Sequence, residues 1–140
     1  MYKQRNKHTR KNTRKAKDIK QLVYRLLQSL IMVKLYHWNT QSYSVHKATD
    51  QLYDDLNTNI DKFIEVLLGK NKRNDMLDIQ SLKIKTFNHN ASFMKWLEQF
   101  KKYLIDIDGL FIPTKDSDIL NIRDEILADL NKISYMLSLK

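Results

Sequence analysis

The chain has 140 residues, a net charge of +9, 2 Gly, 1 Pro and no Cys. Its length suits one domain, and the lack of cysteine excludes disulfide bridges, thiolate metal sites and a cysteine nucleophile. The scarcity of glycine and proline favours long helices over many short strands, and the longest apolar run, Leu30–Val33, is far too short to cross a bilayer.

Residues 1–17 form a basic segment with very few apolar side chains. Residues 1–20 hold nine basic groups and one acid, a net charge of +8, whereas the other 120 residues sum to +1. A segment that buries so little apolar surface cannot offset the entropy lost on ordering, so we expect residues 1–17 to form a flexible, disordered tail. The cationic side chains of this tail are Lys3, Arg5, Lys7, Arg10, Lys11, Arg14, Lys15 and Lys17.

Three kinds of partner suit this tail. A flexible polycation binds the phosphate backbone of nucleic acid without sequence preference, and its affinity falls steeply as salt rises. The same charges also suit a nuclear-import signal, or an arm that docks on an acidic protein surface. We favour non-specific DNA binding, on the charge density and the lack of stacking aromatics beyond Tyr2.

Two amphipathic helices are predicted in the first half of the remaining chain. The first begins near Asp18, and its apolar residues recur at intervals of three and four. They are Ile19, Leu22, Val23, Leu26, Leu27, Leu30 and Ile31, and His37 continues the same stripe. A polar loop follows, in which Ser42 or Ser44 is the expected N-cap. The second helix is predicted from about Val45 to Leu68, with Gly69 as its C-terminal stop.

Two further helices are predicted after an irregular stretch over residues 70–88. One begins near Asn90 and is ended by Asp108-Gly109, and Pro113 prevents it from resuming. The other begins around Asp116–Asp118 and continues to near the end of the chain. The expected inward residues of the last three helices are Leu52, Leu56, Ile60, Phe63 and Leu67, then Phe93, Trp96, Leu97, Phe100, Leu104 and Ile107, then Ile119, Ile122, Ile126, Leu130, Ile133 and Leu137. Residues 18–140 are thus predicted to be an all-α four-helix bundle.

The second predicted helix carries a stripe of potential metal ligands. At about 100° per residue, His46, Asp50, Asp61 and Glu65 fall within about 100° of one another, apart from the apolar row. Imidazole and carboxylate groups are the ligands that iron, manganese and zinc share. The pattern of acids alone is also typical of a helix face exposed to solvent. In the same way, His37 lies on an apolar stripe and could be a buried core residue instead of a metal ligand.

This region resembles the Dps miniferritins. The residues that carry the likeness are His37-Trp38-Asn39, His46-x3-Asp50 and Asp61-x3-Glu65, with eleven residues from Asp50 to Asp61. The stretch 129–137 is similar to the last helix of that family. The loop between His37 and His46, and the connection between the second and third helices, are both shorter than that family usually shows.

The resemblance implies an antiparallel ferritin-like bundle and an iron-binding ferroxidase centre. His37, His46 and Asp50 would come from one subunit and Asp61 and Glu65 from its two-fold partner, so the catalytic residues, which are also the metal ligands, would meet only in a dimer. The cofactor would be iron, as a di-iron centre at the subunit interface. The family expectation is that dimers assemble into a dodecameric cage, and the alternative is an isolated dimer. Such a protein stores iron, protects DNA from oxidative stress, and is intracellular, in the cytoplasm or associated with the nucleoid or nucleus.

A second hypothesis makes the chain non-enzymatic. A helical bundle with a basic tail also suits a structural or nucleic-acid-packaging protein, such as a component of a virion. Iron oxidation separates the two hypotheses, because only the first requires the five proposed ligands.

Overall fold

The computed structural model describes the backbone of residues 2–71 and 75–139 and, within these ranges, every side chain except those of residues 2–9, 12 and 13. All regular structure in these ranges is helical, which confirms the all-α prediction. None of the helices there is long and apolar enough to span a membrane. The elements are α1 (Tyr2–Asn39), α2 (Tyr43–Lys70), α3 (Asn90–Asp106) and α4 (Ser117–Ser138), with short 3-10 turns at Asp75–Leu77 and Ile107–Leu110.

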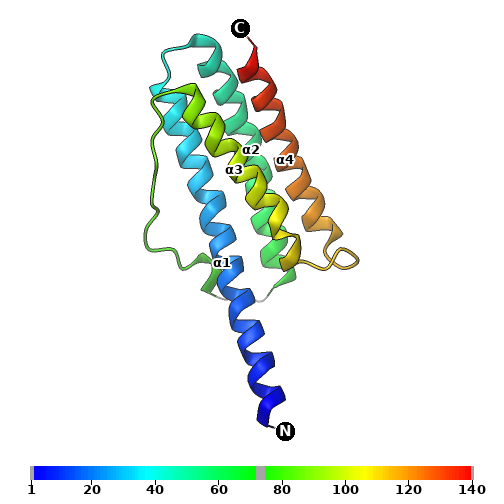
Figure 1. Cartoon of the computed structure of the whole chain (residues 1–140). Helices are drawn as coiled ribbons and strands as arrows, with labels where there is room; N and C mark the ends of the chain where they lie inside the picture. The colour runs from blue at the N-terminus through cyan, green and yellow to red at the C-terminus, as the bar shows by residue number, and fades with distance from the viewer. Residues whose placement is uncertain (1, 72–74, 140) are drawn as a thin grey trace.

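The four helices pack side by side as a bundle with one long connection (Figure 1). A short turn reverses the chain between α1 and α2, so these two helices are antiparallel. The extended segment 78–89 then returns along the length of the bundle, so that α3 runs in the same direction as α2, and α4 runs back antiparallel to α3 (Figure 1). This crossover places α2 between α1 and α4.

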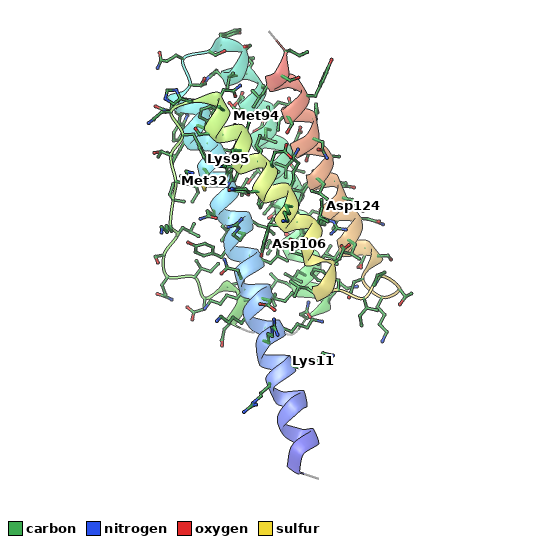
Figure 2. All side chains as sticks on the ribbon, viewed as in Figure 1. Lys11, Met32, Met94, Lys95, Asp106 and Asp124 are labelled. Atoms are coloured by element: carbon green, nitrogen blue, oxygen red, sulfur yellow. The ribbon has the colours of Figure 1, made fainter. Side chains whose placement is uncertain are left out.

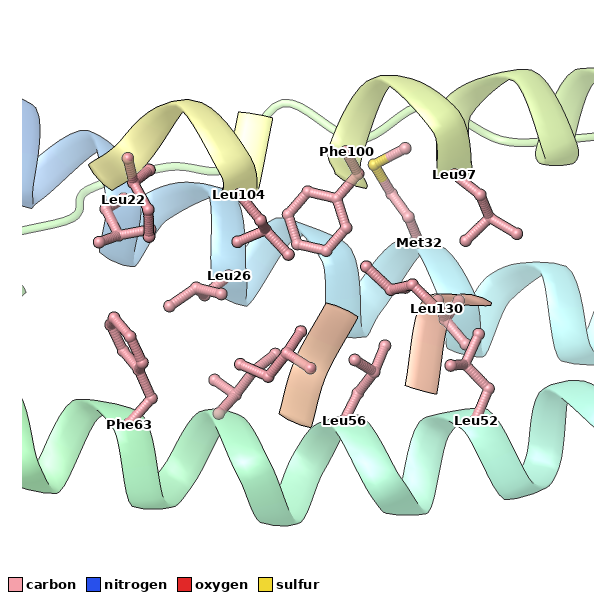
Figure 3. Packing of buried hydrophobic residues seen from close by; sticks show 14 of the residues in the cluster. Leu22, Leu26, Met32, Leu52, Leu56, Phe63, Leu97, Phe100, Leu104 and Leu130 are labelled. Carbon is pink, nitrogen blue, oxygen red and sulfur yellow. The ribbon is translucent and has the colours of Figure 1, made fainter. Parts of the chain in front are cut away.

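The interior is filled by apolar side chains from all four helices (Figure 3). The predicted inward rows of α2 and α3 are buried, as is that of α4 except for the half-buried Leu137. On α1 the prediction was too broad, because Leu27 and Ile31 remain 36 % and 40 % exposed. A stripe with i, i+3, i+4 spacing covers a wider arc than two neighbouring helices bury, and these two residues lie on the outer edge of that arc.

The N-cap of α2 was predicted correctly, but its C-terminus was not. The Ser42 hydroxyl accepts a hydrogen bond from the Val45 N–H, as an N-cap does. The helix continues through Gly69, which does not have a positive φ, and ends at Lys70. The Asn71 side chain and backbone N–H both donate to the Leu67 carbonyl, so an asparagine cap replaces the expected glycine stop.

The start of α1 also differs from the prediction. We expected the helix to begin near Asp18, but α1 begins at Tyr2 and includes residues 2–17, here named the basic arm. No glycine or proline interrupts the sequence from Tyr2 to Asn39, so nothing in it stops a helix. Lys11 lies well beyond the end of the bundle (Figure 2). A helix without a packed face is only marginally stable in water, so the flexibility of the arm stays a prediction.

The depth of the core can be tested at two neighbouring leucines. Leu26 is fully buried, whereas Leu27 is 36 % exposed. We expect Leu26→Ala to lower the free energy of unfolding by about 2–5 kcal/mol, because it leaves a cavity, and to lower Tm by roughly 10 °C. The matched control Leu27→Ala should cost less than about 1 kcal/mol. Equal shifts in thermal melts of the two variants would contradict this packing.

Candidate metal centre

The short turn between α1 and α2 brings His37 and His46 into contact. Their rings stack with centroids 3.9 Å apart and an interplanar angle of 23°. The Nδ1 atom of His37 lies 2.9 Å from the backbone oxygen of His46, and the Nδ1 atom of His46 lies 2.9 Å from the backbone oxygen of His37. A carbonyl oxygen only accepts, so each Nδ1 must carry the hydrogen. The two histidines therefore form a reciprocal pair, here named the histidine clasp.

The clasp determines which ring nitrogen of each histidine can bind a metal. With the hydrogen on Nδ1, the Nε2 atom of a neutral imidazole has a free lone pair. The hydrogen bond from Nδ1 to the backbone carbonyl fixes the orientation of the ring. The Nε2 atom of His37 lies 3.6 Å from Asp50 Oδ1. That is too long for a hydrogen bond but close to the roughly 3.5 Å that separates two ligands on one ion with bonds of about 2.1 Å.

Thr49 supports the clasp from inside the bundle. Its side chain is fully buried, and its hydroxyl donates to the Val45 carbonyl at 2.8 Å. The same oxygen lies 3.3 Å from His37 Nδ1 and accepts a second, weaker contact from that N–H. Sequence reasoning missed Thr49, although its position three residues after His46 places it on the neighbouring turn of α2.

Lys34 lies beside the carboxylate of the site. Its Nζ atom is 3.9 Å from Asp50 Oδ1, 4.5 Å from the centre of the Tyr53 ring and 5.7 Å from that of the Trp38 ring. Two aromatic faces and a carboxylate therefore hold one ammonium group at the edge of the site. Sequence reasoning missed this contact too, although Lys34 precedes His37 by one helical turn.

Asp61 and Glu65 lie elsewhere on α2. Both are exposed, and they follow Asp50 by 11 and 15 residues, which is about 16 Å and 22 Å along a helix. Across residues 2–71 and 75–139, no three His, Asp or Glu side chains lie close enough together to hold a metal ion. Of the five predicted ligands, His37 contacts His46 and lies 3.6 Å from Asp50, but these three do not form a group that could hold an ion, and Asp61 and Glu65 lie further along α2.

The predicted nucleic-acid ligands all lie on the basic arm. The side chains of Lys3, Arg5 and Lys7 lie outside the described residues. The other five side chains, all of them exposed, are Arg10, Lys11, Arg14, Lys15 and Lys17.

Residues 37–137 match DUF5856, a family of unknown function. The chain belongs to this family. The DUF5856 match begins at His37 and so contains all five candidate ligands, whereas the basic arm precedes it. No curated protein and no solved structure matches the chain.

The histidine clasp predicts the tautomer of both rings in this DUF5856 protein. Long-range ¹H–¹⁵N spectra at neutral pH should show His37 and His46 with the hydrogen on Nδ1, because a backbone carbonyl faces each of these atoms. His89, which is exposed, serves as the reference. Hydrogen on Nε2 of either clasp histidine would contradict the geometry.

Proposed function

We propose that this chain is a Dps-like miniferritin that takes up ferrous iron at a site shared by two protomers and oxidises it. The observation that carries the proposal is the histidine clasp, because it leaves both Nε2 lone pairs without a backbone partner and holds the Nε2 atom of His37 3.6 Å from the Asp50 carboxylate. Two imidazoles and a carboxylate are ligands suited to iron. In our proposal, His37, His46 and Asp50 of one chain bind the ion together with carboxylates of another chain.

The connectivity of the bundle supports this assignment. Ferritin-like folds are four-helix bundles with one long crossover connection, whereas simple up-and-down bundles have only short loops. The segment 78–89 supplies such a crossover between α2 and α3, and makes these two helices parallel (Figure 1). We therefore propose that the bundle is ferritin-like, with α1 and α2 as the antiparallel pair that carries the ligands.

A dimer would complete the ligand set. The outer side of α1 exposes Leu27, Ile31 and Trp38, the last of them 67 % exposed. Trp38 therefore lies outside the core of the protomer. Apolar side chains gathered on one side of a helix suit a two-fold contact with a second copy. In our proposal this contact brings the partner's Asp61 and Glu65 to the clasp, and each dimer then holds two complete sites.

The ligand chemistry favours oxidation of bound ferrous iron. Carboxylate oxygens are hard donors and stabilise the ferric more than the ferrous state, and the three proposed carboxylates are Asp50, Asp61 and Glu65. Each ferrous ion gives up one electron. Hydrogen peroxide takes two electrons and two protons and leaves as water, which removes the oxidant of Fenton chemistry. Dioxygen is the alternative oxidant.

The basic arm suits a second role, non-specific DNA binding. Five exposed cationic side chains between Arg10 and Lys17 present a dense positive charge to a phosphate backbone. We propose that the arm is flexible when free and becomes stably helical on DNA, because an unpacked helix needs a partner to offset its ordering entropy. The arm lies at the opposite end of α1 from the clasp, since Lys17 and His37 are about 30 Å apart along the helix.

A structural or nucleic-acid-packaging role without catalysis is the second candidate. The observation that favours it is the incomplete ligand set of the protomer, since Asp61 and Glu65 lie far along α2 from Asp50. Such a protein would keep the bundle and the arm but would not oxidise iron.

Iron oxidation distinguishes the two candidates. Adding ferrous iron and peroxide to the full-length protein should give a rapid ferric absorbance, and His46→Ala or Glu65→Gln should lower its rate at least a hundredfold, because each removes a ligand. Asp106→Asn, an exposed acid at the far end of α3, is the matched control and should react as the unmodified protein does (Figure 2). Equal rates in all four proteins would exclude the ferroxidase.

Deletion of residues 2–17 tests the DNA role separately. The shortened protein should lose retention of duplex DNA in gels at low salt, because most of the positive charge is gone, and should keep its rate of iron oxidation. Unchanged DNA retention after the deletion would show that the arm has another partner.

A further inference from the structure

We infer that the nucleic-acid surface does not end with the basic arm but continues onto the bundle along α1 and the crossover, where Lys83 and Lys85 contact the phosphate backbone of duplex DNA. This inference rests on the DNA-binding role proposed for the arm. The cations from Arg10 to Lys20 on α1, together with Lys83 and Lys85, are here named the basic track.

Lys83 is held rigidly against α1. Its backbone N–H donates to the Tyr24 hydroxyl at 2.7 Å, and its carbonyl accepts from Gln28 Nε2 at 2.6 Å. Tyr24 and Gln28 are one turn apart on α1, so both backbone groups of this one crossover residue are anchored to a single helix face. An exposed lysine on a fixed backbone presents its charge in a defined place and loses less entropy when a phosphate binds.

Lys85 presents its charge on the same side as Lys83. The crossover is extended here, and alternate side chains of an extended chain point the same way. Leu82 and Ile84 are half-buried, whereas both lysines are exposed. The Lys85 Nζ atom lies 5.7 Å from the centre of the buried Phe87 ring. The crossover therefore offers two lysines to solvent and its apolar residues to the bundle.

A groove lies between the arm and the Tyr24 side chain that anchors Lys83. It has a volume of about 460 Å³ and lies between α1 and the crossover, and it is lined by Lys17, Lys20, Gln21, Tyr24, Asp78, Ile79, Gln80 and Ser81. Tyr24 both lines the groove and anchors Lys83. It follows Lys17 by seven residues, about 10 Å along the helix, so positive charge continues from the arm onto the body without a long gap. Asp78, the acid in the groove, is 3.9 Å from Lys20 Nζ.

The opposite flank of the bundle has the reverse charge. Helices α2 and α4 together carry nine acidic and five basic residues, a net charge of −4. A polyanion is repelled by this flank and attracted by the basic track, so the charge distribution gives bound DNA one preferred side.

The salt dependence of DNA affinity tests the track. Fluorescence anisotropy with a 30-base-pair duplex would compare the full-length protein, the double variant Lys83→Gln/Lys85→Gln and the matched control Lys62→Gln/Lys132→Gln, in which two exposed lysines of the opposite flank are removed. Each lost phosphate contact lowers the slope of log K against log salt by about 0.9. The track variant should therefore lose about 1.8 from the slope and bind about tenfold more weakly at 100 mM salt, while the control matches the unmodified protein.

Several results would overturn this inference. If the unmodified protein binds DNA and the track variant binds equally well, the surface is confined to the arm. Equal losses in both double variants would mean that net charge alone matters. Tighter binding to polyglutamate than to duplex at equal charge would assign the track to an acidic protein partner. If the unmodified protein binds no DNA, the DNA-binding role fails together with the track.

Discussion

The reciprocal hydrogen bonds between His37 and His46 are the interaction on which the rest of the proposed site depends. Each ring donates from Nδ1 to the backbone carbonyl of the other residue, across a turn of only three residues between α1 and α2. This pair of hydrogen bonds therefore holds the end of α1 against the start of α2 and leaves both Nε2 atoms without a backbone partner. Thr49 holds the clasp from the bundle interior, and Asp50, one turn after His46, places a carboxylate oxygen 3.6 Å from the Nε2 atom of His37.

The geometry of α2 makes metal binding and assembly interdependent in our account. A straight helix cannot return Asp61 or Glu65 to its own first turn, so their carboxylates can serve a clasp only on another copy. A metal that binds two copies together and neither copy alone stabilises the dimer by mass action. The exposed Trp38 follows His37 directly in the sequence, so an apolar side chain on the outer side of α1 adjoins the clasp.

Hydrophobic periodicity predicted most of the fold, and its errors have physical causes. The buried apolar residues of α2, α3 and α4 were predicted correctly, because each helix faces the core over a well-defined arc. The stop at Gly69 was wrong because Asn71 caps α2 instead, and the expected start at Asp18 was wrong because nothing in the preceding sequence breaks a helix. The motif His46-x3-Asp50 identified one turn of the site. Thr49 and Lys34 were missed because their contacts depend on how α1 packs on α2, and the proposed roles of Asp61 and Glu65 stay predictions.

Complementation between two inactive variants tests the shared site most directly. His46→Ala and Glu65→Gln homodimers each lack a ligand in both sites, but a mixed dimer holds one site with both residues intact. Co-refolding the two variants in equal amounts should restore about a quarter of the ferric absorbance rate, since half of the dimers are mixed and each has one of its two sites complete. If the mixture stays as inactive as its components while native mass spectrometry shows mixed dimers, the two halves of the site do not meet across the interface and the account is wrong.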